Sequence, residues 1–158
     1  MATGETHEIA GIGGVELVIL ASIALQEQQI GDPSFHWALI AGAAAGWMWD
    51  PDVRDLHNIT TRGERRWNRI PLIGAILAYL NEIIWYPLAR LIPHRGWASH
   101  LPGIATLIAL AWVGIIPLFL LGRLNWEILS NPIFWGIFLG WSFLDFIHLA
   151  WDGFGIRW

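Results

Sequence analysis

The sequence predicts an all-α integral membrane protein: a helical bundle of about four spans with one further interfacial or re-entrant helix. Composition is the first reason, because 55% of the 158 residues are hydrophobic and only 14% are charged, whereas a soluble domain has about 25% charged residues. The mean hydropathy is +0.48. The second reason is a series of long apolar stretches. The third is that many of the 12 Trp lie near the ends of these stretches, as in an interfacial aromatic belt.

Five apolar stretches are expected to be helical, at residues 9–30, 35–49, 70–92, 101–122 and 132–151. The fourth and fifth are long enough to cross about 30 Å of hydrocarbon. The second is short and rich in Ala and Gly, so it should pack closely against its neighbours. With no linker, repeat or low-complexity tract, residues 1–158 are expected to form a single domain.

The third stretch is the least suited to crossing a membrane. Asn81 and Glu82 lie at its middle, where they would be costly at the centre of a bilayer. If it does not cross, the N-terminus, the 50–69 loop, the 94–100 loop and the C-terminal turn share one face. The positive-inside rule assigns that face to the cytoplasm, because it carries Arg54, Arg62, Arg65, Arg66 and Arg69. We therefore expect both termini to be cytoplasmic, in a bacterial inner membrane or a thylakoid membrane.

Several kinds of chemistry are excluded by residue usage. The chain contains no Cys and no Lys, which excludes disulfides, iron–sulfur clusters, thiolate zinc sites and Schiff-base catalysis. A formal net charge of −4 argues against nucleic acid as a partner. The N-terminus lacks the basic start of a signal peptide. Any metal ion must therefore be held by His, Asp, Glu, backbone or water.

Histidines and aspartates gather at the ends of the apolar stretches. His94 and His100 bracket a short turn before the fourth stretch, and such a pair can converge on one ion. At the end of the fifth, Asp145, His148 and Asp152 are spaced i, i+3, i+7 and fall within about 60° of one helix face. The alternative for the histidine pair is a solvent-exposed interfacial loop. The alternative for the three residues on one face of the fifth stretch, called the stripe below, is a series of hydrogen bonds between helices.

Two further elements are weaker candidates. Asp50 and Asp52 flank Pro51 at the end of the second stretch, where a proline turn would project both carboxylates. Paired carboxylates suit hard divalent cations, although a polar helix stop is the simpler interpretation. His7 follows Thr6, a plausible N-cap for the first helix. We also expect Ser99 or His100 to open the fourth helix, with Pro102 in its first turn, so that His100 lies beside the free backbone N–H groups at the start of that helix.

These motifs resemble a family of metal-binding integral membrane proteins common in cyanobacteria, itself distantly similar to the bacterial membrane-bound metal-dependent hydrolases, including the LexA-regulated type. They are the opening MATGETHE, Asp50-Pro51-Asp52, His94-Arg95-x-x-x-Ser99-His100 and Asp145-x-x-His148-x-x-x-Asp152. One departure is that the family usually has Gly-Pro before its aspartates, whereas here Asp50 precedes the proline. The resemblance implies a metal-ligand set of His7, Asp50, Asp52, His94, His100, Asp145, His148 and Asp152.

Three functions are consistent with these residues. The first is a metal-dependent hydrolase at the cytoplasmic membrane face, acting on a phosphoester or lipid, in which a bound divalent ion activates water. Zinc is favoured, with manganese, iron or magnesium as alternatives, and Arg95 would neutralise charge developing on the substrate. The second is a non-catalytic, metal-stabilised accessory or assembly subunit of a larger membrane complex. A pigment or haem protein with His148 or His36 as axial ligand is the third, disfavoured by the aspartates beside His148.

Overall fold

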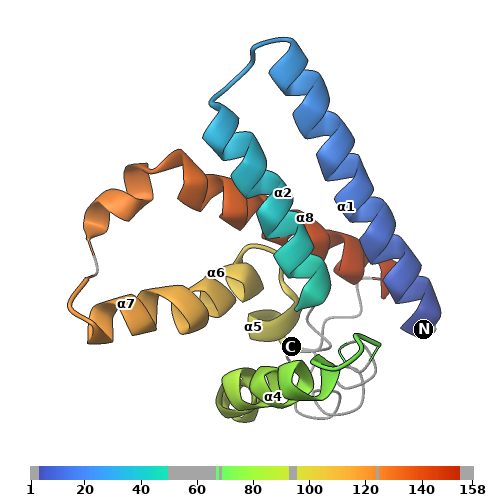
Figure 1. Cartoon of the computed structure of the whole chain (residues 1–158), viewed down its shortest axis with the longest axis vertical. Coiled ribbons are helices and arrows are strands. Elements are labelled where there is room, and N and C mark those ends of the chain that lie inside the picture. The colour runs from blue at the N-terminus through green and yellow to red at the C-terminus, as the bar shows by residue number, and fades with distance from the viewer. Residues whose placement is uncertain (1–3, 50–66, 68, 93–95, 124, 154–158) are drawn as a thin grey trace.

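The computed structural model describes residues 4–49, 67, 69–92, 96–123 and 125–153, with the backbone alone for residues 4–7. Every regular element in this part of the chain is helical, which confirms the predicted all-α class (Figure 1). The elements are α1 (Gly4–Glu27), α2 (Pro33–Met48), α4 (Gly74–Leu91), α5 (Trp97–His100), α6 (Ile104–Leu110), the π-helix η1 (Ala111–Ile115), α7 (Ile116–Leu120), the 3₁₀-helix η2 (Trp126–Ser130) and α8 (Pro132–Trp151).

Helices α2 and α8 begin with the same N-capping arrangement. Asp32 accepts a hydrogen bond from the backbone N–H of Ser34 at 2.7 Å, and Asn131 accepts one from that of Ile133 at 2.8 Å. In each case a proline follows the cap, where its missing N–H leaves nothing unsatisfied. The hydrogen bonds from Ser34 hold the pKa of the Asp32 carboxyl below its usual range. Its capping contribution is therefore present at neutral pH and lost as the pH falls through that lowered pKa.

The closest contact in the fold joins α2 to α8. Both helices carry a Gly-x-x-x-Gly pair, Gly42/Gly46 and Gly136/Gly140. A methyl group added at Gly140 would overlap the carbonyl oxygen of Leu39, and one at Gly136 would come within 2.6 Å of the carbonyl oxygen of Phe35. The two backbones therefore touch with no layer of side chains between them, as small residues allow in membrane helices. This confirms the expected close packing of the Ala- and Gly-rich second stretch.

The order of these contacts makes α2 and α8 parallel. Gly136 meets Phe35 near the start of α2, whereas Gly46 near its end meets Trp141 and Leu144. Helix α1 runs back antiparallel to both, because only the short turn at residues 28–32 joins it to α2. Its N-terminal half consequently packs at the far end, where Gly14 lies against Leu144 and Ile147. The start of α1 and the ends of α2 and α8 thus meet at one end of the molecule (Figure 1).

The fourth apolar stretch differs from its prediction. The long helix begins at Ile104 and not at residue 99 or 100, and His100 instead ends the separate single turn α5. The break falls at Gly103, whose φ of 82° is in the left-handed region that favours glycine. Pro102 lies in the connection, outside the first turn in which we expected it. Beyond the break, α6, η1 and α7 run continuously from Ile104 to Leu120.

Helix α4 covers the end of the molecule where the other helices meet (Figure 1). Its inner face buries Asn81 and Trp85, while Tyr79, Ile83 and Tyr86 are exposed on the outer face. Asn81, which would be costly in lipid, accepts a hydrogen bond from the indole N–H of Trp49 at 2.9 Å. The Trp49 ring lies 6.1 Å from the rings of both Trp85 and Trp141. This trio of indoles, Trp49, Trp85 and Trp141, is called the tryptophan cluster below.

Two described helices are long and apolar enough to cross a membrane. They are Glu8–Glu27 in α1 and Pro132–Trp151, with mean hydropathies of 1.9 and 1.5. The helix from Ile104 to Leu120 is apolar but shorter, and α2 has 16 residues. Two such helices are weak support for a membrane protein, since a buried core helix and a signal sequence have the same properties. The four-span bundle therefore stays a prediction.

The α2–α8 contact makes a direct prediction for stability. Gly140→Ala should force the two helices apart and lower the free energy of unfolding by about 1–3 kcal/mol, the usual cost of overpacking. Gly13→Ala is the matched control, because an added methyl group there meets no atom within 4 Å, and alanine favours the helix by up to about 1 kcal/mol. Thermal unfolding of the purified protein in detergent measures both. Equal melting temperatures for the two variants would contradict the packing described here.

Candidate metal centre

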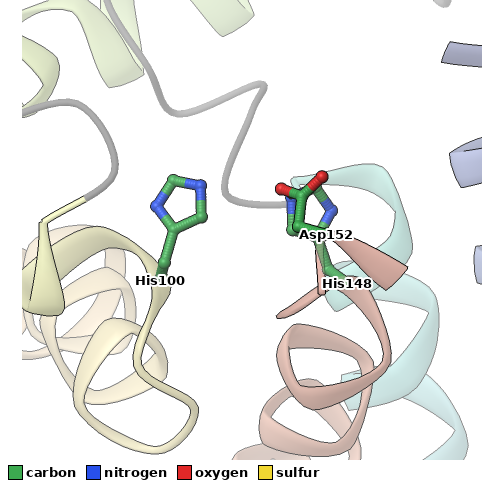
Figure 2. A group of neighbouring side chains, drawn as sticks. All are labelled: His100, His148 and Asp152. Atoms are coloured by element: carbon green, nitrogen blue, oxygen red, sulfur yellow. The ribbon is translucent and has the colours of Figure 1, made fainter. Parts of the chain in front are cut away.

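Three side chains meet at the end of the molecule where α1 begins and α8 ends. They are His100 from α5 and His148 and Asp152 from the end of α8 (Figure 2). Each offers a ligand atom, and these atoms all lie within 4.8 Å of one another. The two imidazole rings are 5.7 Å apart between centroids, and Nε2 of His148 lies 3.5 Å from Oδ2 of Asp152. Figure 2 shows the three converging across the space between the two helices.

The α8 half of this cluster follows from helical spacing. His148 and Asp152 are one turn apart, and Asp145 and Trp141 continue the same stripe toward the start of the helix. Close packing of α8 against α2 holds the stripe in the interior. The side chains of His148 and Asp152 are only 6% and 9% exposed. The separation of 3.5 Å between Nε2 of His148 and Oδ2 of Asp152 is long for a hydrogen bond.

The α5 half depends on the break at Gly103. Because α5 stops after one turn, the chain can present His100 sideways toward α8 before the long helix begins. His100 is 3% exposed, and its Nδ1 lies 2.8 Å from the hydroxyl oxygen of Ser99. That hydroxyl also donates to the carbonyl oxygen of Gly96 at 3.0 Å. Our expectation of His100 beside the free N–H groups of a long helix is wrong, since its own N–H is bonded to Gly96 O within α5.

Asp145 lies on the stripe but outside the group of three. Its side chain is fully buried, and Oδ2 accepts a hydrogen bond of 2.8 Å from the hydroxyl of Thr106 on α6, which is also fully buried. A buried carboxylate is costly unless it is hydrogen-bonded. The hydrogen bond from Thr106 therefore offsets part of the cost of burying the Asp145 carboxylate. Thr106 is not among the site residues predicted from the sequence. The one available signal was a hydroxyl inside an otherwise apolar run.

The surroundings of the cluster are aromatic and tightly packed. Trp141, one turn before Asp145, is 2% exposed and belongs to the tryptophan cluster. A small cavity of about 20 Å³ borders His148 on the side of α1 and α2, where Gly11 and Trp47 line it. Such a volume is enough for one water molecule. The cluster is therefore shielded from bulk solvent on the sides formed by these helices.

The remaining predicted site residues are placed only in part. The backbone of His7 lies in the first turn of α1, which begins at the same end of the molecule as the cluster. Asp50, Asp52, His94 and Arg95 lie outside the described residues. His36 is at the opposite end, where Nε2 donates to the carbonyl oxygen of Ile30 at 2.6 Å, so it fixes the turn between α1 and α2.

The donor set fits a transition-metal ion. Imidazole and carboxylate are standard ligands of zinc, manganese and non-haem iron. Two ligands of a tetrahedral zinc ion with bonds of about 2.0–2.1 Å are separated by roughly 3.3 Å, close to the 3.5 Å between His148 and Asp152. The ligand atoms of the whole group lie within the wider bound of 4.8 Å.

The two histidines and one aspartate of this cluster could hold a metal ion. Comparison with protein families agrees. Residues 2–151 match the family described as Uncharacterized metal-binding protein (DUF2227). Since the match covers nearly the whole chain, the protein belongs to this family. No curated protein and no solved structure matches the chain.

The cluster predicts which histidine holds the metal. Loss of a residue that only hydrogen-bonds to a metal ligand typically lowers metal affinity by roughly 10–100-fold. His148→Ala removes a ligand itself, so it should lower the affinity for Zn²⁺ by more than this. His36→Ala is a matched control, because His36 is also a buried helical histidine but lies at the opposite end. Metal content after dialysis, together with competition against a chromophoric chelator, measures both. Full metal content in His148→Ala would show that the cluster is packing alone.

Proposed function

We propose that the protein is a metal-dependent hydrolase embedded in the membrane, acting at the cytoplasmic face on a phosphoester or lipid. The observation that carries the proposal is the convergence of His100 with His148 and Asp152 in a buried position, in a member of a metal-binding family. Two imidazoles and one carboxylate form a three-ligand set. Catalytic zinc sites use such sets and keep a further position for water, whereas structural sites are closed by four protein ligands.

The metal supplies the reactivity in this proposal. A bound divalent ion lowers the pKa of its water toward about 7 and so provides hydroxide at neutral pH. Zinc is favoured because two histidines and one carboxylate are a known catalytic zinc set. Manganese, iron and magnesium are the alternatives, and iron is supported by the similar ligand set of non-haem oxygenases.

The chain's own residues have distinct parts in the proposed reaction. His100, His148 and Asp152 would each hold the ion through one ligand atom, and the second carboxylate oxygen of Asp152 would be available to accept a proton from water. The tryptophan cluster keeps bulk water from the inner side of the site. Arg95 is proposed to neutralise negative charge that develops on a phosphoester or acyl group.

The proposed membrane location is supported by the exposed apolar surface. Large apolar side chains are exposed along α1, on the outer face of α4 and at the end of α7, among them Leu20, Tyr79 and Leu120 at 60% or more. Lipid is the partner that such a surface fits, since a soluble monomer rarely exposes large contiguous apolar patches. In the four-span arrangement α4 lies at the membrane interface, with its buried Asn81 facing the protein. The expected membrane is a bacterial inner membrane or a thylakoid membrane.

A hydrolase should lose its activity together with its metal. Metal-depleted protein is expected to be inactive in a screen of phosphatase and lipase substrates, and Zn²⁺ or Mn²⁺ should restore the activity. His148→Ala should not be restored, because it lacks a ligand, whereas His36→Ala should behave like the native protein. Activity that survives both chelation and His148→Ala would contradict the proposal.

The alternative is a non-catalytic accessory or assembly subunit of a larger membrane complex. One observation favours it: His100 and the α8 ligands belong to different elements, so a bound ion would cross-link α5 to α8 and stabilise the fold. In that case metal raises the melting temperature of the native protein and not that of His148→Ala, while no substrate is hydrolysed under any metal condition.

The four-span arrangement can be tested without first removing any native thiol, because the chain has no Cys. Gln28→Cys and Glu127→Cys, both at exposed positions, should react with a membrane-impermeant maleimide in intact cells. Arg69→Cys and Trp97→Cys should react only after permeabilisation, because they lie on the predicted cytoplasmic face. Labelling of residues 69 and 97 from opposite sides would exclude the arrangement.

A further inference from the structure

A serine hydroxyl next to His100 occupies a well-defined position between two polar groups. The Ser99 hydroxyl oxygen is 3.0 Å from the carbonyl oxygen of Gly96 and 2.8 Å from Nδ1 of His100. All three groups belong to α5 and its N-cap. Ser99 belongs to the motif His94-Arg95-x-x-x-Ser99-His100, but the metal-ligand set implied by that motif gives it no role.

The single hydroxyl proton links the directions of the two hydrogen bonds, because the bond that takes this proton decides how the other one runs. A hydroxyl has one hydrogen to donate, and the carbonyl oxygen of Gly96 can only accept, so we assign that hydrogen to the bond with Gly96. The contact with His100 must then run the other way, with Nδ1–H donating to the hydroxyl oxygen. A neutral imidazole carries one N–H, so the lone pair of His100 is on Nε2.

This tautomer is the one that metal binding requires. Nε2 is the ring nitrogen turned toward His148 and Asp152 (Figure 2), and a metal ion binds the nitrogen that carries the lone pair. His100 is 3% exposed, so bulk water is poorly placed to substitute for the serine. Partners of this kind orient ligating histidines and typically contribute 10–100-fold, roughly, to metal affinity.

We infer that Ser99 is a positioning residue, which holds His100 in the Nδ1–H tautomer and directs Nε2 at the metal centre. The inference rests on the metal site of the proposed function and deepens it, since it assigns the group that prepares one ligand. It does not depend on the reaction, because an ion that only stabilises the fold needs the same tautomer.

The chain offers a matched control for Ser99. The hydroxyl of Ser130 donates to the carbonyl oxygen of Glu127 at 2.8 Å, the same bond to the third preceding residue. It lies in the short helix η2, is exposed, and has no histidine beside it. Ser99→Ala and Ser130→Ala therefore remove the same local hydrogen bond, and only the first removes the acceptor for His100. Ser99→Thr keeps the hydroxyl.

The test uses the full chain in detergent and two readouts. With Zn²⁺ as the probe, Ser99→Ala should weaken binding by about 10–100-fold, whereas Ser130→Ala and Ser99→Thr stay within about threefold of the native protein. In the metal-free protein at about pH 8, where imidazole is neutral, the ¹⁵N shifts of His100 should report Nδ1–H in the native chain and a mixture of tautomers in Ser99→Ala.

The outcomes separate this inference from the proposed function. Equal Zn²⁺ affinity in Ser99→Ala and native protein, or an Nε2–H tautomer in native protein, overturns the role of Ser99 even if the metal site exists. If native protein shows the Nδ1–H tautomer but binds no metal, the proposed function fails and the directing role toward a metal fails with it, while the hydrogen bond itself stands.

Discussion

Direct contact between the backbones of α2 and α8 is the constraint on which the rest of the structure depends. Four glycines remove the side chains that would otherwise separate the helices, and the carbonyl oxygens of Leu39 and Ile137 occupy the space. At this distance dispersion forces and weak Cα–H···O contacts act over the whole shared length. The contact is parallel, so it brings the C-terminal ends of both helices to the same end. His148 and Asp152 are at that end because of where the glycines lie.

Three hydrogen-bonded pairs of polar side chains lie inside the described part of this apolar protein. Thr106 donates to Asp145, Trp49 donates to Asn81, and His100 is hydrogen-bonded to Ser99. Each pair joins two groups that would be costly to bury alone. All three pairs lie toward the end of the molecule that carries the candidate site. The opposite end has instead the two helix caps and the bond from His36 to Ile30. The concentration of polar pairs marks one end as the site of chemistry.

Much of this arrangement could be predicted from sequence because it depends on short-range rules. The bounds of α8 agree with the predicted stretch at residues 132–151, since Asn131 and Pro132 give an unambiguous start. The stripe from Asp145 to Asp152 follows from helical periodicity alone. Pairing of His100 with His148 was expected from their common position at the ends of apolar stretches, which is a coarse argument but needs no detailed geometry.

Other features depend on contacts between distant segments. No local pattern shows that Gly136 and Gly140 face α2, since each could equally have faced lipid or another helix. The separate turn α5 depends on Gly103, which in sequence resembles any glycine after a proline. Thr106 could be recognised as a partner of Asp145 only once α6 was known to pack against α8.

The backbone contact between α2 and α8 also sets limits on how the site can adjust to ions of different size. The glycines already lie against backbone carbonyl oxygens of the facing helix, so a shift of α8 along α2 would bring larger side chains against that backbone. The position of His148 and Asp152 along α2 is therefore constrained. His100, by contrast, is carried on a single turn joined to the long helix through a glycine. The candidate centre thus has a constrained half on α8, whereas the half on α5 would be the one to adjust to the radius of a bound ion.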